Sequence, residues 1–447
     1  MTDELKAATV APSPWDQATL SINGNKVERG TAPVLLRGQE NVVTVEAPPT
    51  IARALNLGLP EDGGLSIAAS PDFGNWVAPV DGKFTWKITP GTGKSGRIAL
   101  VFFSREVLES WEHRSLVISS NLADEADVKI GGVAVPAGGN WFYRGKVQTV
   151  TLTPKSGSPL AGLPVKLTCA IKSGLDVTNV VSAPAFGSEP TTHSWAVTGN
   201  TKSGTFQLAL SGKGMTTPIT LAVSKLLSSN LADEADVKIA DAAVPAEGNW
   251  FYRNHGRIVT LTPKPNSPLA GLPVTLTWSI KSGLASDSVV SIPAFGSEQT
   301  TYSWAVIGRI HSGTFQLALV GKGMSTPITL AVSKLVSGEL RDEVEVKIGG
   351  QSVPASGNVF IRGQAQEVTL VPKPRSPIAG HNITLTCQPL QGLSEGDIQS
   401  APPFGGIGGP NWSWQVTGYN RSGTFQISVV GAGGVIKPMK IAVSQLI

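Results

Sequence analysis

The 447-residue sequence is poor in cysteine and in charged residues. Only two cysteines occur, Cys169 and Cys387, and charged residues make up 15% of the chain. Two thiols cannot supply the disulfide framework of a small secreted domain, so we expect a fold that does not depend on oxidising conditions. The net charge of +4 is spread thinly and no basic run occurs, which argues against nucleic-acid partners.

Long hydrophobic runs are also missing. No stretch of 18 apolar residues occurs, so we expect no membrane-spanning segment and no membrane insertion. The start, MTDELKAATVAPSPW, lacks the basic and apolar regions of a secretory signal. We therefore expect a soluble protein that stays in the cytosol, leaves without a cleaved N-terminal signal, or is released by lysis as part of a particle. An extracellular or particle-associated location is favoured among these.

The sequence contains little that resembles a catalytic site. No pair among its five histidines has metal-ligand spacing, none lies beside a cysteine, and neither G-x-S-x-G nor H-E-x-x-H occurs. An active site is usually unique, whereas most of this chain is repetition. We predict that the protein is not an enzyme and has no catalytic residues.

The segment GTGKSG, Gly91 to Gly96, resembles the end of a phosphate-binding loop but fails two tests. The first glycine of that motif would fall at Ile88, and the following GRIALVFF predicts a strand where the motif needs a helix. The downstream copies keep only Ser-Gly before an apolar strand. We predict hairpin turns in which glycine supplies a positive φ. These glycines are Gly96, Gly204, Gly313 and Gly423.

These segments belong to four copies of one unit. Trp86, Trp195, Trp304 and Trp414 are separated by 109, 109 and 110 residues. A period of this length is the size of an ordinary domain. The second and third copies are the most alike, and the first is the most divergent. We predict four domains, at about 12–117, 118–227, 228–336 and 337–447.

Each unit is rich in short runs with strand character. Residues 119–227 include QTVTLTP, LPVKLTCAI, HSWAVT, GTFQLAL and PITLAVSKL, bounded by Gly, Pro, Asn or Ser. We expect about seven or eight strands per unit and no helix longer than a turn or two. Many short strands at this spacing indicate an all-β sandwich or barrel.

The unit size, strand number and tandem arrangement resemble bacterial immunoglobulin-like repeats over nearly the whole chain. The tryptophan of HSWAV, YSWAV, FTWKI and WSWQV suits a sandwich core. The Cys…Trp…Cys pattern of antibody domains is absent, so a fibronectin type III-like sandwich is equally allowed. The resemblance implies four tandem immunoglobulin-like β-sandwich domains in an extended array. Joined with almost no linkers, they would reach on the order of 130–150 Å.

Two recurrent features predict core positions. A Pro-x-Phe-Gly motif begins at Pro71, Pro184, Pro293 and Pro402, and its first copy, PDFG, imitates a kinase motif without the rest of the kinase signature. We predict a buried phenylalanine followed by a turn. Cys169 and Cys387 occupy the repeat position of Trp278, which predicts buried free thiols.

Acidic clusters lie at the repeat junctions, in LADEAD, LADEAD and LRDEVE. Carboxylates gathered at a joint could hold calcium, which takes six to eight oxygen ligands, although a spaced D-x-D-x-D loop is missing. The alternatives are a solvated linker, or pairing of the shared Asp with an Arg found in every copy. No other cofactor is expected. The candidate calcium ligands are Asp124, Glu125, Asp127, Asp233, Glu234, Asp236, Asp342 and Glu343.

The aromatic cluster NWFYR is the candidate ligand-binding surface. Every copy of this position is apolar, so burial alone explains it, but flat rings occur only in the two middle copies. If the central Phe142 points inward, its two neighbours share the outer face of the strand. Such a face fits a glycan platform or packing between domains. The candidate residues are Trp141, Tyr143, Arg144, Trp250, Tyr252 and Arg253.

The leading functional hypothesis is a non-enzymatic binding or spacer protein that presents its domains to cell-surface glycans or to a protein partner. It follows from the resemblance, because bacterial immunoglobulin-like repeats serve as adhesin stalks and phage decorations. The alternatives are a secreted toxin or effector component, such as a receptor-binding insecticidal protein, and an accessory binding array of a carbohydrate-active complex. The first repeat is a cap, an anchor or the functional head under this hypothesis.

Overall fold

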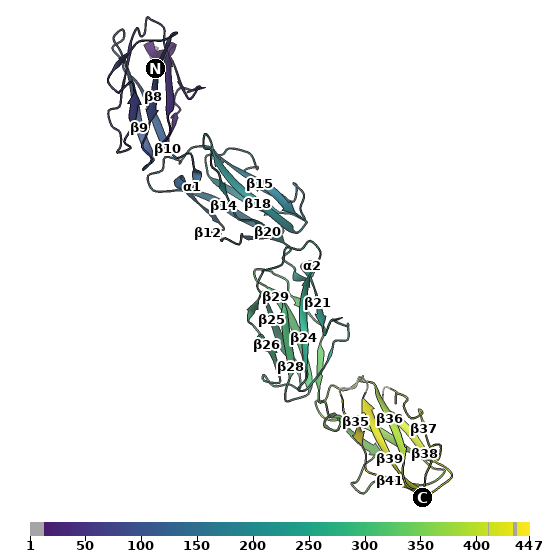
Figure 1. The fold of residues 1–447 in the computed structure, drawn as a ribbon. Coiled ribbons are helices and arrows are strands. Elements are labelled where there is room, and N and C mark those ends of the chain that lie inside the picture. Colours follow the sequence, from purple (N-terminus) through teal and green to yellow (C-terminus); the bar gives the residue numbers. More distant parts are fainter. Residues whose placement is uncertain (1–12, 410, 432–435) are drawn as a thin grey trace, which may run out of the picture. The chain divides into compact units, whose positions relative to one another are not determined.

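The computed structural model describes residues 13–409, 411–431 and 436–447 and divides into two compact units, Met1–Leu227 and Ser228–Ile447. Each unit contains two of the four repeats. Strands dominate both units, and the helices in the described ranges are single turns of four residues (Figure 1). The predicted all-β class is therefore confirmed.

The second repeat consists of two sheets. One has the strand order β12-β11-β14-β17-β16 and the other has the order β13-β20-β18-β15, with β19 beside β18. Strand β13 runs parallel to β20, whereas the neighbours β14 and β17 run antiparallel. The strands are β11 (Ala126–Ile130), β12 (Val133–Ala134), β13 (Trp141–Tyr143), β14 (Val147–Pro154), β15 (Val165–Ser173), β16 (Val180–Ala183), β17 (Ser194–Gly199), β18 (Gly204–Gly212), β19 (Ile219–Thr220) and β20 (Ser224–Leu227).

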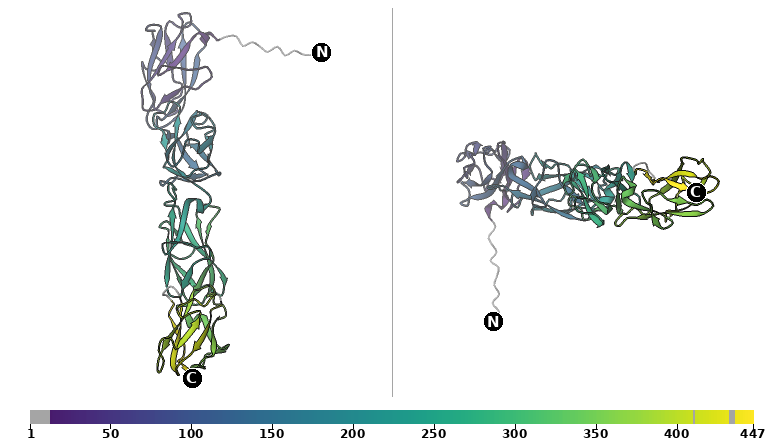
Figure 2. Two further views of the ribbon diagram at one scale, coloured as in Figure 1. Left: turned by 90° about the vertical axis from the view of Figure 1, so that its right-hand side faces the viewer. Right: turned by 90° about the horizontal axis from the view of Figure 1, so that it is seen from below.

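This connectivity identifies the sandwich type. Seven major strands follow one another in the chain: β11, β14, β15, β16, β17, β18 and β20. The first, second, fourth and fifth of them form one sheet, and the third, sixth and seventh form the other. That is the arrangement of a constant-type immunoglobulin domain. The chain is a tandem immunoglobulin-like repeat protein, and the two strand layers of its repeats can be followed in Figure 2.

The third and fourth repeats have the same topology, except that the third has one additional short strand at the edge of its second sheet. The third contains β21 (Ala235–Ile239), β22 (Ala242–Ala243), β23 (Trp250–Tyr252), β24 (Gly256–Pro263), β25 (Val274–Ser282), β26 (Val289–Ile292), β27 (Glu298–Gln299), β28 (Ser303–Gly308), β29 (Gly313–Gly321), β30 (Ile328–Thr329) and β31 (Ser333–Val336). The fourth contains β32 (Val344–Ile348), β33 (Gln351–Ser352), β34 (Val359–Phe360), β35 (Ala365–Pro372), β36 (Ile383–Pro389), β37 (Ile398–Ala401), β38 (Ser413–Gly418), β39 (Gly423–Gly431), β40 (Met439–Lys440) and β41 (Ser444–Leu446).

The first repeat follows the same plan with two differences, a continuous last strand and a short additional strand at one edge of the second sheet. Its sheets have the orders β2-β1-β4-β8-β6 and β3-β10-β9-β5-β7. The last strand, β10, is continuous, whereas the later repeats divide it in two. The strands are β1 (Thr19–Ile22), β2 (Asn25–Lys26), β3 (Val34–Leu36), β4 (Asn41–Glu46), β5 (Leu55–Gly58), β6 (Ala68–Ser70), β7 (Trp76–Val77), β8 (Lys83–Thr89), β9 (Gly96–Ser104) and β10 (Trp111–Ile118).

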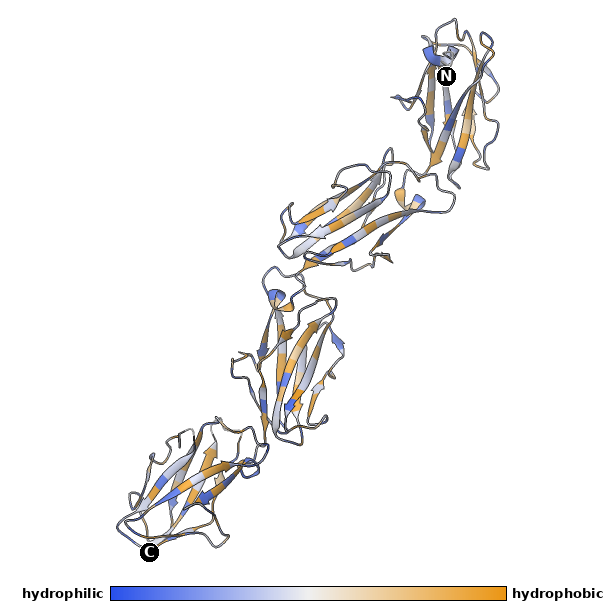
Figure 3. Cartoon of the chain, turned by 180° about the vertical axis from the view of Figure 1, so that it is seen from behind, coloured by the Kyte–Doolittle hydropathy of each residue, from blue (hydrophilic) through white to orange (hydrophobic). Residues whose placement is uncertain are grey.

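Alternation along the strands builds the cores. Hydrophobic and polar residues alternate visibly in Figure 3, and β18 alternates buried and half-buried positions over its whole length. The tryptophans predicted as core residues are completely buried, as expected for the inner face of a sandwich. They are Trp86, Trp195, Trp304 and Trp414.

The divided strand differs from the single strand predicted for PITLAVSKL. In the second repeat, β19 pairs Thr220 with Ala209, and pairing resumes only at Ser224 with Phe206. Between these pairs Leu221 is buried, and its carbonyl accepts a hydrogen bond from Gln207 Nε2 at 2.9 Å. The burial of Leu221 and the hydrogen bond from Gln207 to its carbonyl thus interrupt the backbone pairing of this segment with β18.

The hairpin prediction for the Ser-Gly segments is wrong. Strands β8 and β9 belong to different sheets, so GTGKSG crosses between layers. The four glycines are also absent from the described positions with positive φ. At Gly204 a Cβ would lie 2.3 Å from the Ser173 carbonyl oxygen, and Gly313 and Gly423 are equally crowded. Close approach of another backbone segment is the reason for glycine here.

The turn predicted for Pro-x-Phe-Gly is confirmed, but its phenylalanines are half-buried, which is less complete burial than predicted. Each motif follows a cis peptide bond, and each of its glycines has a φ between 81° and 85°, which a turn of this kind requires. The phenylalanines pack against the cores: Phe73, Phe186 and Phe404 join core clusters, and Phe295 stacks on Trp278 with ring centroids 5.7 Å apart.

The two cysteines are free and half-buried, on β15 and β36. Burial raises the pKa of Cys169 to about 11 and that of Cys387 to about 12, because a thiolate is poorly solvated there. Both side chains pack against core clusters. The prediction of free thiols is confirmed, with less complete burial than expected.

We expect both thiols to react slowly with dithionitrobenzoate at about pH 8 while the protein is folded, since the thiolate is the reactive form. Release of thionitrobenzoate, measured by absorbance, should become fast on addition of guanidinium chloride. A Val181→Cys variant provides the control, because this position is 44% exposed. Equally fast reaction of the native wild type and the control would contradict the burial of the thiols.

Candidate functional site

A one-turn helix opens the second repeat where the sequence has its first acidic cluster. Helix α1 (Leu122–Glu125) begins because Asn121 Oδ1 accepts a hydrogen bond from the backbone N–H of Ala123, a usual N-cap interaction. Leu122 is completely buried and anchors the turn. The helix ends at Ala126, where β11 starts.

The last residue of this helix, Glu125, is a buried carboxylate that joins two repeats. Its side chain is 1% exposed. Oε1 accepts hydrogen bonds from the Ser119 backbone N–H at 2.7 Å and from the Ser95 hydroxyl of the first repeat. Oε2 accepts one from Ser158 Oγ at 2.5 Å. Donors from both repeats therefore converge on one carboxylate, which compensates for its removal from water.

The same joint recurs between the third and fourth repeats. Helix α3 (Leu340–Glu343) ends in Glu343, which is fully buried. Its Oε1 accepts hydrogen bonds from the Ser337 N–H and the Ser312 hydroxyl, and its Oε2 accepts one from Ser376 Oγ. The guanidinium of Arg253 lies 3.4 Å from Oε1.

Helix α2 (Leu231–Glu234) opens the third repeat in the same way. Glu234 is 1% exposed, and within its own repeat it accepts hydrogen bonds from the Ser228 N–H at 2.6 Å and from Ser267 Oγ at 2.6 Å. Ser228 Oγ donates to Asp233 at 2.6 Å. The pattern of serine donors around a buried glutamate is thus common to all three helices.

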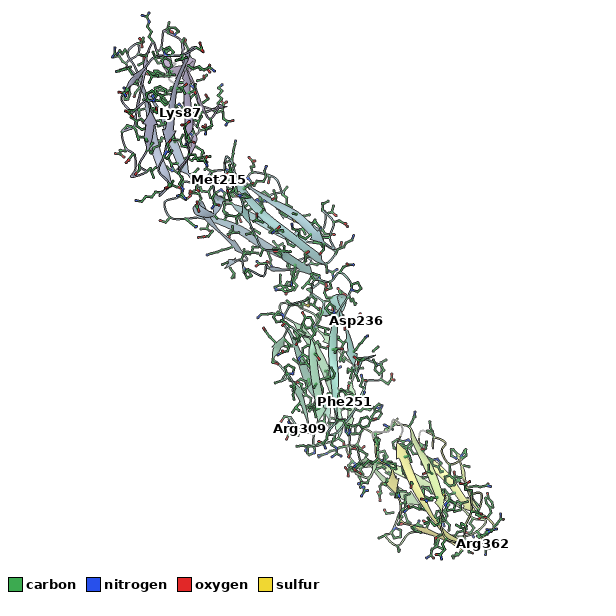
Figure 4. The ribbon with its side chains drawn as sticks, in the orientation of Figure 1. Lys87, Met215, Asp236, Phe251, Arg309 and Arg362 are labelled. Carbon is green, nitrogen blue, oxygen red and sulfur yellow. The ribbon has the colours of Figure 1, made fainter. Side chains whose placement is uncertain are left out.

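The aspartates of α1 and α3 pair with arginines of the preceding repeat. Arg37 lies 3.0 Å from Asp124, and Arg253 lies 3.4 Å from Asp342. A hydrogen bond from Ser119, with that from Arg37, lowers the pKa of Asp124. The Asp–Arg alternative therefore describes both joints, with Arg and Asp supplied by different repeats. Figure 4 labels Arg362, the equivalent arginine of the fourth repeat.

Two further predicted calcium ligands form exposed ion pairs with lysines. Asp127 and Asp236 are exposed and lie 3.9 Å and 3.8 Å from Lys155 and Lys264. Residues 13–409, 411–431 and 436–447 contain no group of three or more His, Cys, Asp or Glu side chains placed to hold a metal ion. Interdomain calcium stays a prediction.

Melting in calcium and in EDTA would test it, because bound calcium raises the melting temperature.

The aromatic cluster alternates as expected. Phe142 and Phe251, the latter labelled in Figure 4, are buried, with their neighbours on the other side of the strand. Lys225 Nζ lies 4.3 Å from the Trp141 ring centroid, a cation–π distance. Trp141 and Tyr143 are partly buried, and ligand binding by them and by Arg144 stays a prediction.

In the third repeat the corresponding rings pack against the fourth. Trp250 meets the His381 ring edge-on, with centroids 4.8 Å apart, and the Tyr252 hydroxyl lies 3.3 Å from His381 Nε2. Burial lowers the pKa of His381 and raises that of Tyr252. Arg253 is paired with carboxylates of the fourth repeat. All three candidate residues of the third repeat therefore contact the fourth repeat, as expected if the aromatic cluster serves packing between domains.

A groove in the first repeat was not identified from the sequence. It has a volume of about 890 Å³, within the range of small-molecule sites. Residues of β9 and β10 line it, together with the segments around Arg29 and Glu61. The signal was present in the repeat alignment: the first repeat has Trp-Glu-His-Arg at 111–114 where the second has Thr-Leu-Ala-Val at 220–223.

Two tryptophans and a histidine line this groove. Trp15, from the helix η1 (Pro14–Gln17), stacks on Trp111 with centroids 5.4 Å apart, and the ring of His113 meets Trp111 edge-on at 4.6 Å. Burial lowers the pKa of His113, and the charge of Arg29 lowers it further. The imidazole is therefore neutral at pH 7.

The buried carboxylate of Glu125 is expected to contribute strongly to the free energy of unfolding. Glu125→Ala should lower the free energy of unfolding by about 3 kcal/mol, because it leaves buried donors without an acceptor. Asp127→Ala removes an exposed carboxylate and should change it by less than about 0.5 kcal/mol. Calorimetric unfolding of both variants measures the difference. Equal stabilities of the two variants would show that the buried network contributes nothing.

Comparisons with known proteins give fold neighbours only. No protein-family model matches the chain, and no curated protein sequence matches it. Similar solved structures include FdeC, an adhesin of Escherichia coli, at 16% identity and a TM-score of 0.33, covering 72% of this chain and 97% of that one. InvE, an adhesin of Yersinia pseudotuberculosis, is 18% identical with a TM-score of 0.21, covering 46% and 58%.

A four-domain fragment of ICAM-5 is 11% identical with a TM-score of 0.25, covering 96% of this chain and 100% of that one. TM-scores this low support no argument about function. No helix within the described ranges is both long and apolar enough to cross a membrane. The tandem immunoglobulin-like fold therefore rests on the sheet topology of the chain itself.

Proposed function

We propose that the protein is a non-enzymatic binding protein in which the first repeat carries the ligand site and the later repeats act as a spacer. The ligand would be a cell-surface glycan or protein. The proposal rests on a contrast between two features. The hydrogen-bond network around the buried glutamate recurs at the joints, whereas the groove is lined by residues that differ between the first repeat and the others.

The recurrent joints support the spacer role. Each buried glutamate accepts hydrogen bonds from fixed backbone and serine donors, and in two joints a donor comes from the preceding repeat. Such contacts restrict movement between neighbouring repeats, because bending a joint would leave a buried charge unpaired. A spacer needs this property, whereas binding needs a surface that differs from the repeating units.

Direct binding tests the proposal. Fluorescently labelled full-length protein is applied to whole cells and to a glycan array, with unlabelled protein as competitor. We expect saturable binding, and the variant Trp141→Ala to bind within about threefold of wild type, since the ring lies outside the first-repeat groove. Its unfolding is measured in parallel.

Two results would contradict the proposal in different ways. Absence of saturable binding to every cell and glycan would overturn the binding role. Loss of binding in Trp141→Ala with unchanged stability would keep the binding role but move the ligand site to the middle repeats, where the sequence analysis placed it.

A further inference from the structure

The joint between the third and fourth repeats contains a histidine where the second and third repeats have leucine. His381 precedes β36, and the equivalent residues are Leu163 and Leu272. The backbone carbonyls of all three accept a hydrogen bond from a side chain at one shared repeat position, which confirms their equivalence. His381 is 6% exposed. A titratable group therefore occupies a position where an apolar side chain also suits the fold.

Both ring nitrogens of His381 are used in its neutral form. Nδ1 lies 3.1 Å from the backbone carbonyl oxygen of Asn382, which can only accept a hydrogen bond, so we assign the proton to Nδ1. Nε2 then accepts a hydrogen bond from the Tyr252 hydroxyl of the third repeat, at 3.3 Å. The contact between the repeats thus selects one neutral tautomer.

Aromatic rings of the third repeat cover this imidazole. The Trp250 ring meets it edge-on with centroids 4.8 Å apart, and the centroid of the Tyr252 ring lies 6.5 Å away. Both rings belong to β23, whereas His381 belongs to the fourth repeat. Separation of the two repeats would therefore remove both rings from the imidazole and return it to water.

The charged groups around this contact are cations. Lys334, on β31, has its Nζ 4.4 Å from the Trp250 ring centroid and donates to a backbone carbonyl of the fourth repeat at 3.1 Å. Arg257, on β24, lies 6.0 Å from the centroid of the Tyr252 ring. Within residues 13–409, 411–431 and 436–447, no carboxylate forms an ion pair with His381. A positive charge on this imidazole would thus have no compensating partner.

The joint between the first and second repeats has the same contact without a titratable group. Leu163 stands at the histidine position, and Val34 and Leu36 stand at the positions of Trp250 and Tyr252. These three apolar side chains pack against one core cluster of the second repeat. No proton can bind at that contact, so it provides an internal comparison.

We propose that protonation of His381 opens the joint between the third and fourth repeats on mild acidification, while the joint between the first and second repeats stays closed. Protonation places a charge between two rings and beside cations, and it removes the Nε2 lone pair that accepts the bond from Tyr252. The inference goes beyond the proposed function, because it concerns how the stiffness of the spacer is controlled.

The direction of the pH dependence follows from the two states of the joint. Burial lowers the pKa of His381 in the closed joint, the hydrogen bond to Asn382 offsets part of this effect, and the charge of Lys334 lowers the pKa further. In water an imidazole has a pKa of about 6.5, so the open joint binds the proton more readily. Stability of the joint that is present above about pH 6.5 is therefore lost as the pH falls below this value. Asp and Glu side chains ordinarily titrate below about pH 5.

Fluorine NMR of the full-length protein labelled with 3-fluorotyrosine tests the inference. The chain has four tyrosines, and the resonance of Tyr252 is identified by its loss in Tyr252→Phe. Replacing H₂O by D₂O shifts the resonance of a solvent-exposed fluorine, and Tyr252 is 6% exposed in the closed joint. We expect this solvent isotope shift to be at least about threefold larger at pH 5.0 than at pH 7.5, and the change to be reversible. Tyr302 of the same repeat is 7% exposed and should not respond.

Three variants that copy other repeats test the role of the histidine. His381→Leu introduces the residue of the second and third repeats and should abolish the pH response of Tyr252. Lys334→Gln, which copies Gln445 of the fourth repeat, removes the neighbouring cation and should make the response smaller. His193→Tyr removes a buried histidine of the second repeat, copies Tyr302, and should leave the response unchanged.

The results that overturn the inference are distinct from those that test binding. An equal isotope shift of Tyr252 at pH 5.0 and 7.5 shows that the joint stays closed. An equal response in wild type and His381→Leu shows that another group opens it. A simultaneous change at Tyr302 indicates unfolding of the third repeat instead of opening of the joint. Each of these results overturns the inference, and none involves a ligand, so binding measured at pH 7.5 decides the proposed function separately.

Discussion

A buried glutamate at the start of each of the last three repeats is the constraint on which the joints depend. Glu125, Glu234 and Glu343 are at most 1% exposed, and a carboxylate at such a position is tolerated only when donors saturate it. The donors come from a backbone N–H, from serines and, in two joints, from the preceding repeat. The short helix, its cap and the serine positions all follow from this requirement.

The same helix position has a different use in the first repeat. There the turn carries Trp15 in place of Ala123, and Trp15 stacks on Trp111 beside the groove. Ala99 and the unbroken β10 then leave open a surface that glutamine and a buried leucine or isoleucine fill elsewhere. A few substitutions on an unchanged sandwich therefore convert a structural position into part of a candidate ligand site.

Features set by local sequence could be predicted from the repeats, whereas features that depend on contacts between strands or on differences between repeats could not. The core tryptophans, the inward Phe142 and the Pro-x-Phe-Gly turns follow from residue type and position, because period-2 alternation and turn chemistry are local. The role of Gly204 was misjudged, since the backbone of Ser173 approaches it from another strand. The groove is not predictable from the positions that the copies share, because it is lined by residues such as His113 and Ala99 that differ from their equivalents in the other repeats.

The sequence by itself determined the all-β class, the four tandem repeats and many of the residues that fill their cores, because burial depends on hydrophobicity and spacing along the chain. The immunoglobulin-like type of the sandwich was identified only by the sheet connectivity. Only the tertiary structure decided how the acidic clusters and the aromatic clusters are used. Glu343 is surrounded by donors from three separate segments, and Trp250 and Tyr252 meet His381, which lies more than a hundred residues away in the sequence. Such contacts depend on which strands become neighbours in space, and no local pattern in the sequence specifies that.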